Sequence, residues 1–340
     1  MAKPSATNLR ALWAVSKEKI GSVLRNSIVQ NNALLYEIKQ KGGMIEVEDG
    51  GREFNEPAIV GDSAAVGGAR RDSLLNIDEQ QGIDAFLYSP AIFYGTTHLY
   101  TTDKNINAGS GRAVSILTAK TKQTEESINN GMDVYLFGSN QDGTGSPTAS
   151  DTGTQFGWLG TRDLIPDTAT QDIPGTGISK ATYTKARSRV VTTAVASNTA
   201  WNTNSVGRQI LQDLYNGASF GSKRPNLMVF TRTIWDAIQI SMQNNEQWVN
   251  AGGQDQKIGY PHLGYMGNCR ITWGDNVQAG HGYVFNTEFL KFKVLQGANF
   301  EVGDFIEDIQ TFQEVAKTLI QGQFCLSGPK FQSVYTGASF

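Results

Sequence analysis

The stretch PNLMVFTRTIWDAI, from Pro225 to Ile238, joins two elements of different type. Four consecutive apolar residues, Leu227 to Phe230, follow a proline and predict a short buried strand. Apolar residues then recur at three- and four-residue spacing, which predicts an amphipathic helix capped by the hydroxyl of Thr231 or Thr233. The apolar positions of this helix are Ile234, Trp235, Ile238 and Met242. No catalytic pattern accompanies them, so the stretch predicts a packing unit of mixed α and β structure.

The segments on either side add further strands and helices. Downstream, the glycine-spaced runs LGYMGNCRITWG (Leu263 to Gly274) and GYVFNTEFLKF (Gly282 to Phe292) predict two strands, the second closing on an Asn-Thr pair. Aromatic and β-branched residues predict other strands, and helical spacing predicts a helix from Ser205 to Asn216. The other predicted strands are 83–88, 91–101, 190–195 and 315–326, the last followed by a polar tail.

Residues 110–137 form the longest predicted helix. If it is continuous, its 28 residues span about 42 Å. Its apolar residues gather at the two ends, whereas the middle, TAKTKQTEES, is almost wholly polar. Such a helix is too polar for a core, so we expect a strut that crosses a surface.

Composition bounds the class of protein. At 340 residues and 37.0 kDa, with 39% hydrophobic residues, the chain can form one large or two moderate domains. No apolar stretch is long enough to span a membrane, and the first residues lack a signal-peptide core, so we expect a cytoplasmic protein. Cys269 and Cys325 form no CxxC pair and are predicted to be buried apolar residues.

The net charge of −3 conceals two blocks of opposite sign. Residues 1–43 carry seven basic and two acidic residues, a net of +5, and contain two helical patterns, 8–20 and 22–39. Residues 44–103 carry eleven acidic and three basic residues, a net of −8. Within them, residues 44–82 are glycine-rich with few large apolar residues, so we expect this segment to project. The blocks are either differently solvated surfaces or a basic arm and an acidic loop that meet across subunits.

Motifs that could carry chemistry are weak. Gly217 to Gly221 reads GxSxG, but a helix precedes Ser219 and a strand follows, the reverse of a nucleophile elbow. The three histidines, His98, His262 and His281, lack metal-ligand spacing and are predicted to be structural. The loop 142–151 lacks calcium-ligand spacing, and residues 107–112 predict a plain helix cap rather than an anion site. No basic stripe with interleaved aromatic residues marks a nucleic-acid surface.

In its order of elements the chain resembles a tailed-bacteriophage major capsid protein of the Hong Kong 97 type. The resemblance covers nearly the whole chain, and besides the opening stretch it is anchored at Asn105 to Gly138, Gly157 to Pro166 and Val315 to Phe331. It implies an α+β fold with an N-terminal arm, an extended β-hairpin loop, a long spine helix, a peripheral domain and an axial α/β domain. The implied ranges are an arm at 1–43, an extended loop at 44–104, a peripheral domain at 105–202 with its spine helix at about 110–137, an axial domain at 203–313, and a return strand with a C-terminal tail at 314–340.

The resemblance also implies a function without catalysis. The chain would assemble into pentamers and hexamers of an icosahedral virion head that encloses double-stranded DNA, formed in the cytoplasm of a bacterial host. Implied partners are further copies, a separate scaffolding protein, a portal and a possible decoration protein, with no membrane, no cofactor, no metal and no catalytic residue. One alternative is an encapsulin-like compartment that encloses cargo enzymes, and a remote one is a serine hydrolase that uses Ser219.

One departure from some family members concerns covalent bonds between subunits. Those members join subunits by an isopeptide bond from an extended-loop lysine, but this chain has no lysine between Lys41 and Lys104. We therefore expect a shell held together by noncovalent contacts.

Overall fold

A computed structural model gives the fold of most of the chain. It describes residues 34, 37, 44–47, 52–62, 66, 70, 71, 74, 82–100, 124, 127, 128, 131, 132, 134–138, 157–242, 263–265, 269–299, 301–307 and 313–339. The predicted sites at 107–112, 142–151 and His262 lie outside these residues, as does most of the arm 1–43.

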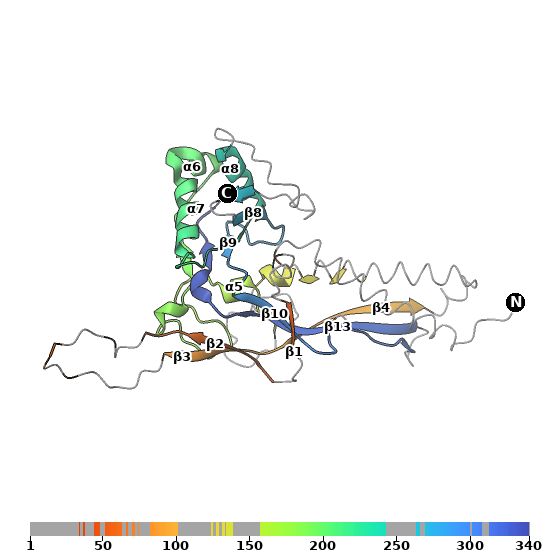
Figure 1. Cartoon of the computed structure of the whole chain (residues 1–340). Coiled ribbons are helices and arrows are strands. Elements are labelled where there is room, and N and C mark those ends of the chain that lie inside the picture. The colour runs from red at the N-terminus through yellow and green to blue at the C-terminus, as the bar shows by residue number, and fades with distance from the viewer. Residues whose placement is uncertain are drawn as a thin grey trace.

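The longest described strand, β13 (Gln313–Leu326), organises the first sheet, which we call the β13 sheet. Four strands pair with it in antiparallel fashion: β4 (Ala91–Tyr100), β10 (Leu290–Leu295), β11 (Glu301–Val302) and β12 (Ile306–Glu307). A further strand, β1 (Met44–Val47), lies parallel to β10. Figure 1 shows β4 and β13 running side by side as a long ribbon away from the rest of the molecule.

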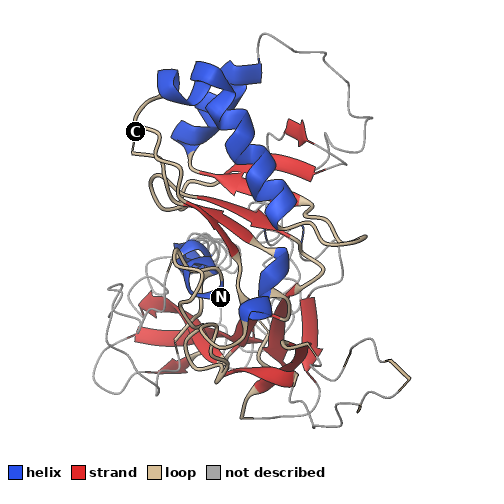
Figure 2. Cartoon of the chain, turned by 90° about the vertical axis from the view of Figure 1, so that its left-hand side faces the viewer, coloured by secondary structure: helices blue, strands red, loops and turns tan. Residues whose placement is uncertain are grey.

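The second sheet, which we call the β6 sheet, has the strand order β5-β14-β9-β6-β8-β7. Its strands are β5 (Arg189–Val191), β6 (Leu227–Phe230), β7 (Leu263–Tyr265), β8 (Cys269–Trp273), β9 (Gly282–Phe285) and β14 (Ser333–Tyr335). Three helices, α6 (Asn198–Asn202), α7 (Val206–Gly217) and α8 (Arg232–Met242), gather beside it at one end of the molecule (Figure 2). The remaining short elements are α5 (Thr161–Leu164), η1 (Thr184–Ala186), η2 (Thr203–Ser205) and η5 (Pro329–Phe331).

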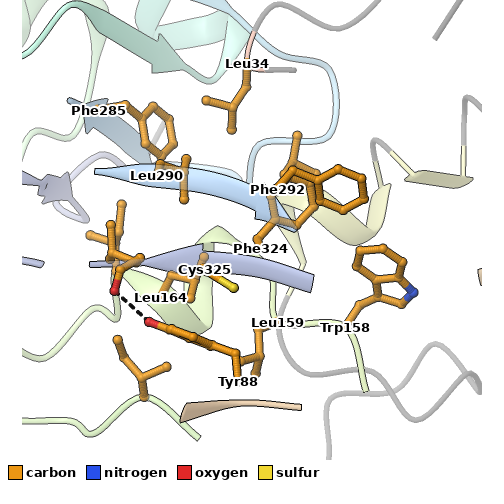
Figure 3. Packing of buried hydrophobic residues seen from close by; sticks show 14 of the residues in the cluster. Leu34, Tyr88, Trp158, Leu159, Leu164, Phe285, Leu290, Phe292, Phe324 and Cys325 are labelled. Atoms are coloured by element: carbon orange, nitrogen blue, oxygen red, sulfur yellow. Dashed lines mark hydrogen bonds between the residues drawn. The ribbon is translucent and has the colours of Figure 1, made fainter. Parts of the chain in front are cut away.

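Strand β6 is apolar at every position because both of its faces are covered. Met228 and Phe230 pack in a cluster with the helices, whereas Leu227 and Val229 pack in a second cluster that extends to the β13 sheet. Figure 3 shows part of that second cluster, where Trp158 lies beside Phe292 and Phe324. The buried strand predicted at 227–230 is thus confirmed, and it contributes side chains to both hydrophobic clusters.

The helix predicted after this strand is confirmed, with Ile234, Trp235 and Ile238 buried. The Thr231 hydroxyl, just before this helix, lies 2.9 Å from the carbonyl oxygens of both Gln278 and His281. Because the hydroxyl donates toward the loop before β9, it holds that loop to the start of α8. The cap predicted at Thr231 or Thr233 stays a prediction.

Other predicted elements are found with small shifts. The strands predicted at 83–88, 91–101 and 315–326 are β3 (Ile83–Tyr88), β4 and β13, and the helix predicted at 205–216 is α7. Helical residues between Thr124 and Phe137 agree with the C-terminal half of the predicted long helix, and its first half lies outside the described residues. Both cysteines are fully buried, as predicted.

Three expectations are corrected. The strand predicted at 190–195 ends at Val191, and Val195 forms only an isolated bridge to Ala338. The run 282–292 splits after Phe285, so that β9 joins the β6 sheet and β10 joins the β13 sheet. The polar tail contains β14, whose three residues are all buried because it lies between β5 and β9.

Candidate assembly surfaces

The β2–β3 hairpin is the first candidate surface. Strand β2 (Phe54–Ile59) pairs with β3 in antiparallel register and with no other described strand. Phe54, Phe86 and Tyr88 are buried in the core at its root, and the Tyr88 hydroxyl donates a 2.8 Å hydrogen bond to the Leu326 carbonyl of β13 (Figure 3). Because the root is held by the core, the hairpin has a fixed direction relative to the β13 sheet.

A buried ionic cluster holds the same root. The Glu56 carboxylate of β2 lies 2.7 Å from Lys293 Nζ and 3.2 Å from Lys291 Nζ, both on β10. Lys293 also donates to the Asn55 carbonyl at 3.2 Å. Glu56 is 3% exposed, so these two lysines replace most of the solvent around its carboxylate. No local pattern predicts this cluster, although the alternation LKFKVL in β10 indicates that both lysines share one face of the strand.

The far end of the hairpin has the opposite character. Ile59 and Ile83 form a directly opposed pair and are 76% and 79% exposed. Between the two strands along the chain, Val66 and Leu74 are 85% and 99% exposed. We call these four residues the hairpin tip. The directly opposed pair Ile59 and Ile83 is the part of this tip where two large apolar side chains are exposed as neighbours, as at surfaces that contact a partner.

Strand β4 contributes the second candidate surface. Its inner face packs on the helical residues 124–131: Thr97 Oγ1 lies 2.9 Å from Thr124 Oγ1, and a side chain at Gly95 would come within 2.7 Å of Ile128. On its outer face Ile92 and Tyr94 are exposed. Ile306 of β12, also exposed, lies on the same face, because β13 aligns it with His98 through Val315. We call Ile92, Tyr94 and Ile306 the open sheet face.

The residues singled out for chemistry do not come together. Ser219 follows α7, and its hydroxyl donates a 2.6 Å hydrogen bond to the Tyr215 carbonyl of that helix. His98 is exposed on β4, whereas His281 is buried beside Asp167. Within the described ranges, no three His, Cys, Asp or Glu side chains cluster as metal ligands would, and no helix is both long and apolar enough to cross a membrane.

One buried cation stands apart from these surfaces. Lys180 is fully buried in the segment between α5 and β5, and its Nζ has no hydrogen-bond partner among the described atoms. Burial lowers the pKa of this ammonium to about 8, and the nearby Asp172 carboxylate offsets only part of the effect. A protonated amine without a partner costs stability in such a place.

Replacing Lys180 with methionine is therefore expected to stabilise the chain by about 1–3 kcal/mol at pH 7. The folded-state pKa lies below the unfolded value of 10.5. The cost is therefore complete below about pH 8 and disappears as the pH rises toward 10.5. Urea unfolding at pH 7 and pH 10 measures both effects. The exposed Lys317→Met is the control, and equal gains at the two pH values would contradict the assignment.

No protein-family model matches the chain, and no curated protein matches its sequence. Solved structures do match the fold. The capsid asymmetric unit of cyanophage A-1(L) gives a TM-score of 0.56 at 15% identity, over 87% of this chain and 90% of that one. The chain has the fold of a tailed-phage capsid protein.

Two further structures share this capsid fold. The capsid of a native GTA particle gives a TM-score of 0.55 at 10% identity, over 89% of this chain and 90% of that one. A virus-like particle from Pyrococcus furiosus gives 0.53 at 10% identity, over 94% and 99%. The predicted resemblance is thus confirmed at the level of the fold. Within this capsid fold, the hairpin tip and the open sheet face are places where described residues leave large apolar side chains exposed.

Proposed function

We propose that this chain is the major capsid protein of a tailed phage, a subunit with no catalytic role. Many copies would form the pentamers and hexamers of an icosahedral head that encloses double-stranded DNA. The observation that carries the proposal is the β2–β3 hairpin in a capsid fold: its root is anchored in the subunit core, and its tip exposes Ile59 and Ile83. Burial of such a tip against a neighbouring copy would contribute to association in proportion to the apolar area covered.

The domain plan proposed for the subunit follows the Hong Kong 97 type. Residues 1–43 form the arm, 44–104 the extended loop, 105–202 the peripheral domain, 203–313 the axial domain and 314–340 the return strand and tail. Some strands cross these limits, since β10 joins the β13 sheet while β5 and β14 join the β6 sheet. A scaffolding protein, a portal and a decoration protein are proposed partners, and assembly is proposed to occur in the host bacterial cytoplasm.

Electron microscopy of the expressed chain tests the proposal directly. Negative stain should show closed shells for the wild type, whereas Ile59→Asp combined with Ile83→Asp should give unassembled subunits, because charge at the tip opposes its burial. The matched control is Ile240→Asp, the same change at a half-exposed position of α8. Absence of shells in the wild type, even with a scaffolding protein, would contradict the proposed function.

The contents of purified particles distinguish a phage head from a compartment. The encapsulin-like alternative is supported by the match to a virus-like particle. Nuclease-protected double-stranded DNA inside particles from the native source supports the phage head. Cargo protein without DNA would support the compartment, and the assembly surfaces would be the same in both cases.

The shell is expected to be noncovalent. Because no lysine lies between Lys41 and Lys104, the extended loop has no lysine before its last residue, and we expect it to form no isopeptide bond. Particles boiled in denaturing detergent should run as one band near 37.0 kDa. A ladder of covalent multimers that persists after reduction would contradict this expectation.

A further inference from the structure

The histidine that precedes β9 lies at a junction between separate parts of the chain. His281 is 8% exposed, and its carbonyl accepts hydrogen bonds from the backbone N–H and the hydroxyl of Thr231, at the start of α8. Its ring Nε2 lies 3.3 Å from Oδ1 of Asp167, which follows α5. The residues before Asp167, Leu164 and Ile165, are buried in the core that extends to the β13 sheet. The contact of His281 with Asp167 therefore joins the α5 segment to the β6 sheet and its helices.

The two ring nitrogens of His281 face two acceptors. Nδ1 lies 2.8 Å from the Ala279 carbonyl, which cannot donate, so Nδ1 must carry a proton to bond there. In a neutral ring that tautomer leaves a lone pair on Nε2, 3.3 Å from Oδ1 of the negative Asp167 carboxylate. Only the imidazolium has a proton for both neighbours. The contact between Nε2 and Asp167 is therefore attractive when His281 is protonated and repulsive when it is neutral.

One cation lies near the pair, and it lowers the pKa of both His281 and Asp167. Arg162 Nε lies 3.9 Å from Asp167 Oδ2, so one further cation faces the carboxylate from α5. Asp163 accepts a hydrogen bond from the Gly160 N–H and belongs to the same turn. On β9, the ring of Tyr283 stacks at 6.4 Å from that of His281. Burial raises the pKa of the Tyr283 hydroxyl, so this group is neutral across the physiological range.

The pKa of His281 is raised and the pKa of Asp167 is lowered, so both shifts favour the charged form. Burial alone would lower the pKa of His281, but its contacts with Asp167 and with the Ala279 carbonyl outweigh burial and raise the pKa above 6.5. The contact with His281 lowers the pKa of Asp167 below its ordinary value, although burial opposes the change. Both shifts describe a pair that is stable when both members are charged.

We propose that His281 and Asp167 form a pH-sensitive tie between the α5 segment and the β6 sheet, closed when the imidazole is protonated and open when it is neutral. The raised histidine pKa means that the stabilisation is complete below about pH 6.5 and is lost as the pH rises through the folded-state value. The lowered aspartate pKa sets the acid limit, below which the carboxylate is neutral. If the proposed function holds, shells built from this subunit resist heat and denaturant better at pH 5.5 than at pH 8.

The melting temperature of the unassembled full chain tests the tie between pH 5.5 and pH 8.5. The wild type is expected to lose about 2–4 °C over this range through the tie, and His281→Gln and Asp167→Asn are each expected to remove that part of the slope. The double variant should match the single ones, because the pair acts as one unit. His98→Gln is the control, since His98 is exposed on β4, and it should keep the wild-type slope.

Unchanged slopes in both variants would overturn the tie. If a variant fails to fold, the wild-type ring decides the matter through an NMR titration of the His281 Cε1–H signal. A midpoint above 6.5 supports the tie, and a midpoint at or below 6.5 overturns it. Both measurements use unassembled chain, so a failure to form shells would count against the proposed function and leave this result standing.

Discussion

Replacing Glu56 with alanine is expected to lower the free energy of unfolding by about 3–5 kcal/mol. The change removes the only carboxylate that the described structure places against Lys291 and Lys293, at 3.2 and 2.7 Å. Lys293 is nearly buried, so its ammonium would be left without a counter-charge. The same change also loosens the root of the hairpin, because Glu56 is the ionic contact between β2 and β10.

The measurement is urea unfolding of the unassembled chain, with hydrogen exchange of the β2 and β3 amides as a second readout. Faster exchange in β2–β3 than in β6 would show that the loss begins at the hairpin. The matched control is Glu288→Ala, which breaks an exposed ion pair with Lys223 and is expected to cost less than about 1 kcal/mol. Equal losses for the two variants would show that the buried cluster contributes no more than a surface pair.

Replacing Gln323 with alanine is expected to cost about 3 kcal/mol or more. This side chain of β13 is 1% exposed, and its amide makes hydrogen bonds with backbone groups of other segments, as a neighbouring strand would. Its Oε1 accepts from the Leu159 N–H at 3.0 Å, and its Nε2 donates to the Gly157 carbonyl at 2.9 Å and to the Ser89 carbonyl at 3.2 Å. The Phe324 N–H also donates to the same Oε1 at 3.1 Å, so four backbone groups in or near the core lose this partner.

A second variant separates packing from hydrogen bonding at this position. Gln323→Leu keeps most of the volume and removes every hydrogen bond, so it is expected to remain destabilised by a similar amount. The fluorescence of Trp158 should also shift toward longer wavelength in both variants, because Gln323 holds residues 157–159 and thereby places that indole against Phe292 and Phe324. Wild-type stability in Gln323→Leu would show that the side chain acts only by filling space.

Local sequence predicted the elements that are specified by a pattern of residues close together in the chain. The run Leu227 to Phe230 and the helix after it are confirmed, because an apolar run behind a proline and a helical repeat are both local signals. The order of elements also predicted the capsid fold, which the solved structures confirm at identities of 10–15%. Proteins with few identical residues can share the same order of elements, since many apolar residues can fill the same core.

The candidate surfaces were only partly predictable. Glycine content and the lack of large apolar residues predicted that residues 44–82 project, but β1 joins the β13 sheet and Phe54 is buried. No local signal showed that Ile59 and Ile83 oppose each other at the hairpin tip. Exposure is a property of the folded chain, and an isoleucine in a strand is more often buried than exposed. Likewise, His281 was predicted to be structural, and nothing in the sequence near position 281 indicates Asp167.

The sequence by itself determined strand β6, helices α7 and α8, the two buried cysteines and the order of elements that resembles the capsid fold, because periodicity and apolar runs act over a few residues. The tertiary structure decided which strands pair, and it alone made a strand of Ser333 to Tyr335 and divided β9 from β10. It also brought Glu56 to Lys291 and Asp167 to His281. Such contacts form because burial leaves a charged group few partners, and the fold determines which of them lie within reach.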